Sequence, residues 1–208
     1  MRIQTPLEEK LNACSHGLGA FLGLIALYLL VCYNTGKSDW SLFSVVVYAL
    51  SIIILFSAST FYHATKNDKR KHYFRIVDHI SIYILIAGTY TPVCLIALQD
   101  SLGWPLFYTV WGIALFGAFL KLFFTGRFEV VSTLLYLVMG WLIVFDISNL
   151  SAQIGSQGMW FLAAGGSAYS LGIIFYAVQK IPYNHVIWHL FVLTGAVCHF
   201  LMIFNYVI

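Results

Sequence analysis

Residues 41–62 read SLFSVVVYALSIIILFSASTFY, a run without a single Asp, Glu, Lys, Arg or His. A helix needs about 20 mostly apolar residues to cross about 30 Å of hydrocarbon, so this run has the length and composition of a transmembrane helix. The rest of the chain has the same character, because 61% of its 208 residues are hydrophobic and only 9% are charged. A soluble domain usually carries about 25% charged residues. The sequence therefore predicts a membrane protein.

Six further apolar runs of similar length occur along the chain. The seven runs fall near residues 17–33, 41–62, 76–98, 104–124, 130–150, 159–179 and 186–207. Loops of 5 to 13 residues separate them, which leaves no room for a soluble domain. Polar residues precede the first run and no small-residue cleavage site follows it, so we expect a retained helix rather than a signal peptide. We predict an all-α fold, a seven-transmembrane helical bundle that forms one integral membrane domain over residues 1–208.

The basic residues indicate how this bundle is oriented. With seven spans the loops alternate between the two sides, and ten of the eleven Lys and Arg residues then share one side, with only Lys37 on the other. The positive-inside rule places the amino terminus in the cytoplasm and the carboxyl terminus outside. The basic run 66–71 is interpreted as a topology signal beside lipid head groups, and no nucleic-acid partner is predicted. The four cysteines show no paired spacing and are expected to be buried free thiols.

Metal-binding residue types gather at the predicted cytoplasmic boundary. Ionisable side chains there usually face the bundle interior, a cavity or each other, because contact with hydrocarbon is costly. His185 and His189 lie four residues apart at the start of the last run and therefore share one helical face. His63 ends the second run, and Asp78 lies about one turn into the third. Three imidazoles form the open ligand set of a catalytic zinc site, in which water keeps the fourth position.

Further polar residues near this point could support such a site. Ser59 lies on the second run, one helical turn before the histidine that ends it. Asp78 has three possible roles: a fourth metal ligand, a partner that orients an imidazole, or a base hydrogen-bonded to the metal's water. Glu8, Asn12 and His16 precede or begin the first run, where they either cap the helix or brace the site from behind its ligands.

Three other ionisable residues are not assigned to the site. His199 lies fourteen residues after His185, which is about 21 Å along a helix and too far to share its metal. A hydrogen-bonded core histidine is the simpler interpretation, and the wall of a deep cavity is the alternative. Glu129 and Asp146 flank the fifth run, where solvation at the membrane boundary explains both.

These residues resemble the motifs of a known family. The stretch Ser59-Thr-Phe-Tyr-His63, then Asp78, then His185-Val-Ile-Trp-His189 is similar to the three-part signature of the hemolysin III proteins. Those proteins are grouped with the progestin and adipoQ receptors and, more distantly, with the alkaline ceramidases. The resemblance runs from about residue 8 to the carboxyl end, and the main departure is His79, where the receptors commonly have tyrosine.

The resemblance implies a protein of the bacterial cytoplasmic (inner) membrane with a zinc cofactor. It implies that His63, His185 and His189 hold the zinc, that Asp78 contacts it through water, and that Ser59 lies close by. A hydrolase acting on an amide or ester of a membrane lipid is the first function class, with a role in lipid homeostasis. In that case Asp78 accepts the water proton and returns it to the leaving group, and Ser59 hydrogen-bonds the water or the developing oxyanion.

The second function class is a non-catalytic sensor or regulator of membrane fluidity or energetics, in which structural zinc joins two spans. A structural site is normally closed by a fourth protein ligand. The two classes therefore differ in whether Asp78 binds the metal directly or leaves that position to water. A proton-coupled transporter or a lytic pore is a more remote class. Membrane lipids are the expected partners throughout.

Overall fold

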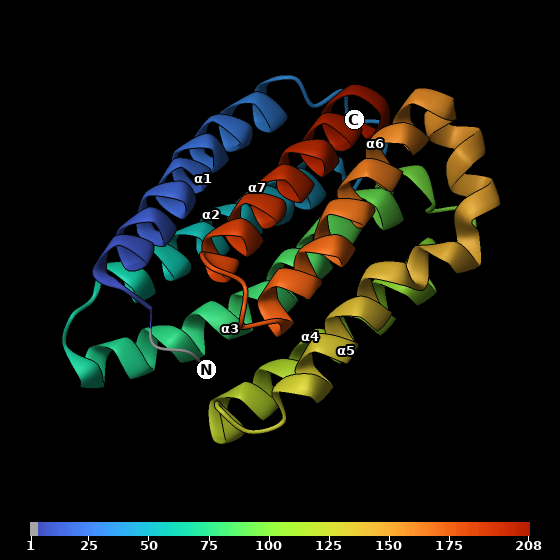
Figure 1. Cartoon of the computed structure of the whole chain (residues 1–208). Coiled ribbons are helices and arrows are strands. Elements are labelled where there is room, and N and C mark those ends of the chain that lie inside the picture. The colour runs from blue at the N-terminus through green and yellow to red at the C-terminus, as the bar shows by residue number, and fades with distance from the viewer. Residues whose placement is uncertain (1–3) are drawn as a thin grey trace.

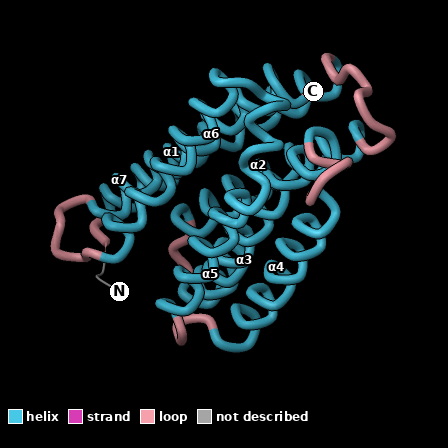
Figure 2. Tube along the Cα trace, turned by 90° about the vertical axis from the view of Figure 1, so that its right-hand side faces the viewer, coloured by secondary structure: helices cyan, strands magenta, loops and turns pink. Residues whose placement is uncertain are grey.

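The computed structural model describes residues 4–208, and this part of the chain is helical and contains no strand. The all-α prediction is therefore confirmed. The elements in order are α1 (Pro6–Cys32), α2 (Ser41–Ala64), α3 (Asp68–Pro92), η1 (Val93–Ala97), α4 (Gly103–Phe124), α5 (Glu129–Trp141), η2 (Leu142–Asp146), α6 (Ile147–Ala177), α7 (Asn184–Met202) and η3 (Ile203–Val207). Figure 2 shows that the short loops lie at the two ends of the bundle.

Six helical segments of the described chain are long and apolar enough to cross a membrane. One of them, Glu129–Ala177, has 49 residues because α5, η2 and α6 follow one another without a loop. This segment is not straight: η2 is a 3₁₀ turn, and Gly155 inside α6 has a left-handed φ of 65°. Figure 1 shows α5 and most of α6 running in opposite directions. The seven spans and the orientation of the termini stay predictions.

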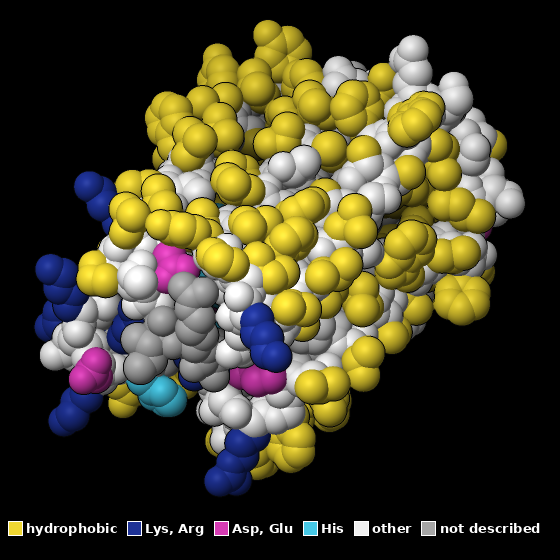
Figure 3. All heavy atoms as spheres, viewed as in Figure 1, with side chains coloured by type: hydrophobic (Ala, Val, Ile, Leu, Met, Phe, Trp, Pro, Cys, Tyr) yellow, Lys and Arg dark blue, Asp and Glu magenta, His cyan; other side chains and the backbone are white. Residues whose placement is uncertain are grey.

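Large apolar side chains cover the outside of the bundle. In Figure 3 they occupy most of the visible face, and the charged side chains gather at one end of it. Phe145 and Trp160 are each about three-quarters exposed, as suits side chains that contact lipid rather than water. Cys14 and Cys32 are exposed as well, so the expectation of buried thiols was wrong for these two, although all four cysteines are free. The molecule is an integral membrane protein.

The first helix begins with a pair of reciprocal hydrogen bonds. The Thr5 hydroxyl oxygen accepts from the backbone N–H of Glu8 at 3.2 Å, and the Glu8 carboxylate accepts from the backbone N–H of Thr5 at 2.8 Å. Such a capping box satisfies two of the N–H groups that every helix start leaves free, and Pro6 suits the first turn because it has no N–H to satisfy. Glu8 is thus a capping residue.

The helices that carry the candidate site pack in the order α7, α1, α2, α3. Figure 1 shows the starts of α1, α3 and α7 and the end of α2 at the same end of the bundle. Gly19 permits a close approach of α1 to α2, since a Cβ at this position would lie 2.5 Å from the Phe56 ring. Phe56 in turn meets the ring of His16 edge-on at 4.9 Å. This packing fixes the position of His16 relative to α2.

Asp146 is part of a buried hydrogen-bond network, so its interpretation as a solvated boundary residue was wrong. It is only 4% exposed. Its carboxylate accepts hydrogen bonds from the Ser101 hydroxyl at 2.6 Å, from the Leu102 backbone N–H at 2.9 Å and from the Asn149 amide at 2.7 Å. These bonds satisfy the start of α4 and connect it to the turn between η2 and α6.

Glu129 likewise joins three helices instead of simply facing solvent. One carboxylate oxygen lies 2.7 Å from Lys121 Nζ on α4, and the other lies 3.3 Å from Arg75 Nη2 on α3. The Lys121 side chain is only 1% exposed, and Glu129 is 27% exposed. A buried ammonium needs such a partner, so this cluster closes the charged ends of α3, α4 and α5.

Candidate metal centre

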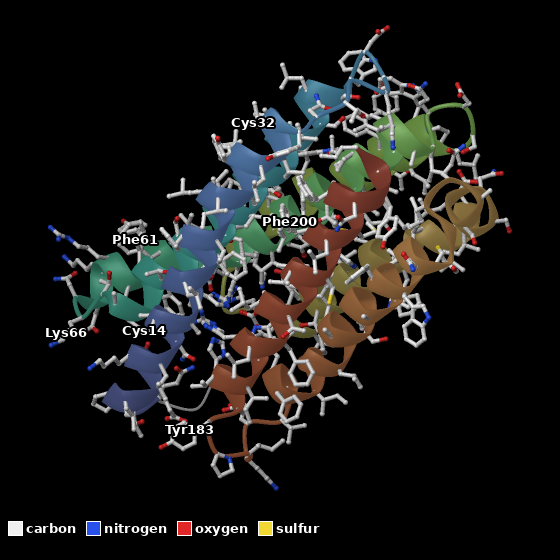
Figure 4. The ribbon with its side chains drawn as sticks, turned by 90° about the horizontal axis from the view of Figure 1, so that it is seen from above. Cys14, Cys32, Phe61, Lys66, Tyr183 and Phe200 are labelled. Atoms are coloured by element: carbon white, nitrogen blue, oxygen red, sulfur yellow. The ribbon has the colours of Figure 1, made fainter. Side chains whose placement is uncertain are left out.

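The three histidines predicted as metal ligands have ring nitrogens that lie close together. His63 on α2 and His185 and His189 on α7 each offer one ring nitrogen, and these three atoms lie within 4.8 Å of one another. The ring centroids are 4.7 to 5.1 Å apart. His63 and His189 are buried, and His185 is partly buried. Figure 4 labels Cys14 on α1 and Tyr183 just before α7, and His185 and His189 belong to the first two turns of α7.

The unpaired ring nitrogens suit a metal ion. His63 Nδ1 lies 2.7 Å from a Glu9 carboxylate oxygen, which places the imidazole proton on Nδ1 and leaves the lone pair on Nε2. Within the described residues, His63 Nε2 and His189 Nδ1 are buried and have no hydrogen-bond partner. An unpaired buried polar atom costs free energy, and a bound cation would remove that cost where the nitrogen coordinates it. Three clustered imidazoles fit zinc and similar divalent ions.

Glu9 is the residue of this site that sequence reasoning missed. Its carboxylate contacts His63 Nδ1 and Lys71 Nζ, each at 2.7 Å, and so links α1 to α2 and α3. A carboxylate behind a ligating imidazole fixes the tautomer and orientation of the ring and strengthens it as a ligand. The adjacent Glu8, which the sequence named as a candidate, caps the helix instead. Only the rotation of α1 against α2 decides which of the two faces the histidines.

The other three α1 candidates have different roles. Glu8 caps the helix, as described above. The Asn12 amide donates to the Gln4 side-chain oxygen and so organises the start of the chain. His16 stacks directly on His189, with ring centroids 3.6 Å apart and planes inclined by 13°. His16 and the backbone of Asn12 thus both contact a candidate ligand, His189.

Asp78 and Ser59 lie beside the histidines on the wall of a cavity of about 330 Å³. Ser59 is buried, and its hydroxyl faces the Asp78 carboxyl group as a hydrogen-bonding neighbour. Asp78 is not a member of the group whose ligand atoms lie within 4.8 Å of one another. The carboxyl group of Asp78 and the hydroxyl of Ser59 thus lie beside the three histidines without joining their close ligand group.

The cavity extends from the histidines into the apolar centre of the bundle, between α3, α5, α6 and α7. Much of its wall is hydrocarbon, including Leu85, Ile86, Ile143, Met159, Leu162 and Val192. Trp141 and Val144 also line it and are more than half exposed, so the cavity reaches the outer surface near η2. A pocket of this size is typical of small-molecule sites, and its opening lies on the apolar outer surface.

Comparisons with known proteins agree with the motifs. A family model described as "Haemolysin-III related" matches residues 4–200. The chain is 43% identical over 202 residues to Hemolysin-3 of Bacillus cereus, which covers 97% of this chain and 92% of that protein. It is 42% identical over 201 residues to the Hemolysin-3 homolog of Bacillus subtilis (strain 168), with 96% and 94% covered. The human monocyte to macrophage differentiation factor is 28% identical over 211 residues, with 97% and 85% covered. The predicted resemblance is confirmed, and the chain belongs to the haemolysin-III family.

Proposed function

We propose that this protein is a zinc-dependent hydrolase that cleaves an amide or ester bond of a membrane lipid and acts in membrane lipid homeostasis. The observation that carries the proposal is the group of three histidines at one end of an apolar cavity, with Asp78 and Ser59 on the same wall. A cavity that opens on the apolar outer surface suits a substrate with acyl chains.

The proposal includes the membrane arrangement. We place seven spans in the bacterial cytoplasmic membrane as one integral domain, with the amino terminus in the cytoplasm and the histidines near the cytoplasmic face. The ten-to-one distribution of basic residues supports this orientation. A lipid could then reach the site from within the bilayer.

His63, His185 and His189 would hold the metal, and Glu9 and His16 would keep two of these rings in place. A three-histidine set with an open position is typical of catalytic zinc, whereas magnesium and calcium prefer oxygen ligands. When bound, zinc supplies a Lewis acid for a carbonyl group and lowers the pKa of water. Asp78 lies outside the close ligand group, which supports an open site over a closed structural one.

Asp78 acts in this proposal as the base. It accepts a proton from water as the water oxygen bonds to the substrate's carbonyl carbon. The bond from that carbon to nitrogen or oxygen then breaks, and Asp78 returns the proton to the leaving amine or alcohol. The Ser59 hydroxyl donates a hydrogen bond to the carbonyl oxygen as negative charge develops there. The products are a fatty acid and an amine or an alcohol.

A second function, a sensor or regulator with structural zinc, is supported by one feature of the packing. α2 and α7 each pack closely on α1 but make little direct contact with each other. An ion held by His63 from α2 and by His185 and His189 from α7 would connect these two helices. In that case occupancy of the site, rather than a reaction, would control the shape of the bundle.

Metal analysis of the purified protein, combined with fatty-acid release from a panel of lipid amides and esters, separates the two functions. The hydrolase proposal expects zinc and product release in the wild type, loss of both in His189→Ala, and retained zinc without turnover in Asp78→Asn. His72→Ala is the matched control, because His72 is exposed and outside the cluster. Bound zinc without release from any lipid favours the sensor. Absence of metal from the wild type overturns both.

A further inference from the structure

His199 lies on the cavity wall far from the metal centre. It follows His189 by ten residues on α7, which is about 15 Å along the helix axis. The side chain is nine-tenths buried, with 9% of its surface exposed. One ring nitrogen faces the Leu162 backbone carbonyl, and within the described residues neither nitrogen makes a hydrogen bond of good geometry. His199 lines the cavity, which is the alternative interpretation given by the sequence, and the Leu162 carbonyl is its backbone neighbour.

The imidazole of His199 is at best partly satisfied at this depth. A neutral imidazole carries one donor and one acceptor, and the Leu162 carbonyl can serve only the donor. Burying the acceptor without a partner costs free energy that phenylalanine in the same space would not. Two polar side chains on the wall away from the metal centre are paired with the backbone: the Thr89 hydroxyl donates to the Leu85 carbonyl, and the Tyr90 hydroxyl donates to that of Gly140. His199 thus retains hydrogen-bonding capacity that the described protein does not use.

Two glycines make room for His199 and for the neighbouring Tyr169. A Cβ at Gly165 on α6 would lie 2.4 Å from His199 Cδ2, and a Cβ at Gly195 on α7 would lie 2.8 Å from the Tyr169 ring. Each helix therefore has a glycine at the point where the polar ring of the other helix packs against it. The ring centroids of Tyr169 and His199 are 5.5 Å apart, and both residues line the cavity. The packing of α6 against α7 holds the two polar rings in place.

We infer that Tyr169 and His199 form a second polar site, which binds a hydroxyl group carried partway along a lipid chain. A hydroxyl both donates and accepts hydrogen bonds, so it can pair with the imidazole and the phenol at once. A carboxylate offers no donor and an ammonium no acceptor, and either charge is costly among apolar residues. The apolar wall between the two sites fits hydrocarbon.

The inference rests on the proposed function only for the orientation of the lipid in the cavity, with its carbonyl group at the metal centre. A lipid whose carbonyl lies at the metal centre would reach His199 with a group near the middle of its chain, since the two sites are about 15 Å apart along α7. The favoured substrate class is then a lipid amide or ester whose acyl chain carries a hydroxyl near its middle. Binding at Tyr169 and His199 does not itself require turnover.

Ricinoleic acid and oleic acid provide the test, because they share one chain and differ by a mid-chain hydroxyl. Displacement of a fluorescent fatty acid from the purified, metal-loaded protein gives the affinity for each. The wild type should bind ricinoleic acid about tenfold more tightly than oleic acid. This ratio corresponds to the net free energy of about one hydrogen bond. His199→Phe should abolish this preference and keep the affinity for oleic acid, which also shows that the variant is folded. His199→Gln should keep part of the preference.

Equal affinities in the wild type would overturn the inference and leave a trapped water molecule as the partner of His199. Failure of the wild type to bind either acid, or a preference that survives in His199→Phe, would overturn it as well. The outcome is independent of catalysis, because the preference should persist in Asp78→Asn. Absence of hydrolysis would defeat the proposed function and leave this site standing. Hydrolysis without any preference for the hydroxyl would support the proposed function and overturn the second polar site.

Discussion

The Nδ1 atom of His63 lies 2.7 Å from a carboxylate oxygen of Glu9, although the two residues are 54 positions apart in the sequence. The other oxygen of Glu9 contacts Lys71 at the same distance. Three helices thus converge on the Nδ1 side of the His63 ring. Because a carboxylate in this position fixes the imidazole tautomer, Glu9 connects the packing of α1 to the chemistry of the site.

Replacing Glu9 by Gln should weaken zinc binding by about 10- to 100-fold, as is usual when the partner of a ligating histidine is lost. Competition with a chelator of known affinity measures the effect. Asp39→Asn removes an exposed carboxylate outside the site and should bind zinc as the wild type does. Equal zinc affinity of Glu9→Gln and the wild type would show that the contact is structural only.

The stack of His16 on His189 should contribute through ring contact rather than through hydrogen bonds. His16→Ala is expected to reduce zinc affinity by about 2- to 10-fold, because this ratio corresponds to the free energy that one aromatic pair contributes. His16→Phe keeps the stack and should restore the affinity. Restoration by Asn but not by Phe would instead indicate that a hydrogen bond of His16 matters.

Ser59→Ala separates oxyanion stabilisation from metal binding. Loss of one preorganised donor usually lowers kcat by about 10²- to 10³-fold. We expect a fall of that order in kcat with unchanged zinc content, measured as release of fatty acid at saturating lipid. Zinc loss in this variant, or an unchanged kcat, would remove Ser59 from the proposed chemistry.

The Lys121–Glu129 pair should matter for stability and not for the metal. Glu129→Gln leaves a buried ammonium without its countercharge, which is strongly destabilising in fully buried pairs. Because Glu129 is partly exposed, we expect a smaller loss of about 2 kcal/mol in unfolding free energy. Lys121→Met combined with Glu129→Gln should recover part of that loss. Unfolding of the protein in detergent, followed by circular dichroism, gives the comparison.

Much of the fold could be predicted because hydrocarbon imposes simple requirements on sequence. Apolar runs such as 41–62 must become helices, since every backbone group in the bilayer needs an internal partner. The continuous course of the chain from α5 through η2 into α6 could not be predicted. It depends on the local turn at η2 and on the left-handed backbone at Gly155, which the pattern of apolar residues does not reveal.

The candidate site was predictable where it depends on spacing and depth along a helix. His185 and His189 share a face because they are four residues apart, and His63 lies at the same end of the bundle. The choice of Glu9 over Glu8 and the seating of His199 opposite Gly165 depend on how the helices rotate against one another. Those rotations arise from packing of many side chains, so they appear only in the folded structure.

X-ray absorption spectroscopy at the zinc edge identifies the ligands of the bound ion and so tests the proposed open zinc site. We predict zinc with three imidazole nitrogens at about 2.0–2.1 Å and one oxygen from water. We also predict an unchanged nitrogen shell in Asp78→Asn. A wild-type protein that binds no zinc, or a spectrum without three imidazoles, would contradict zinc binding by His63, His185 and His189. A carboxylate ligand that disappears in Asp78→Asn would indicate a closed, structural site instead.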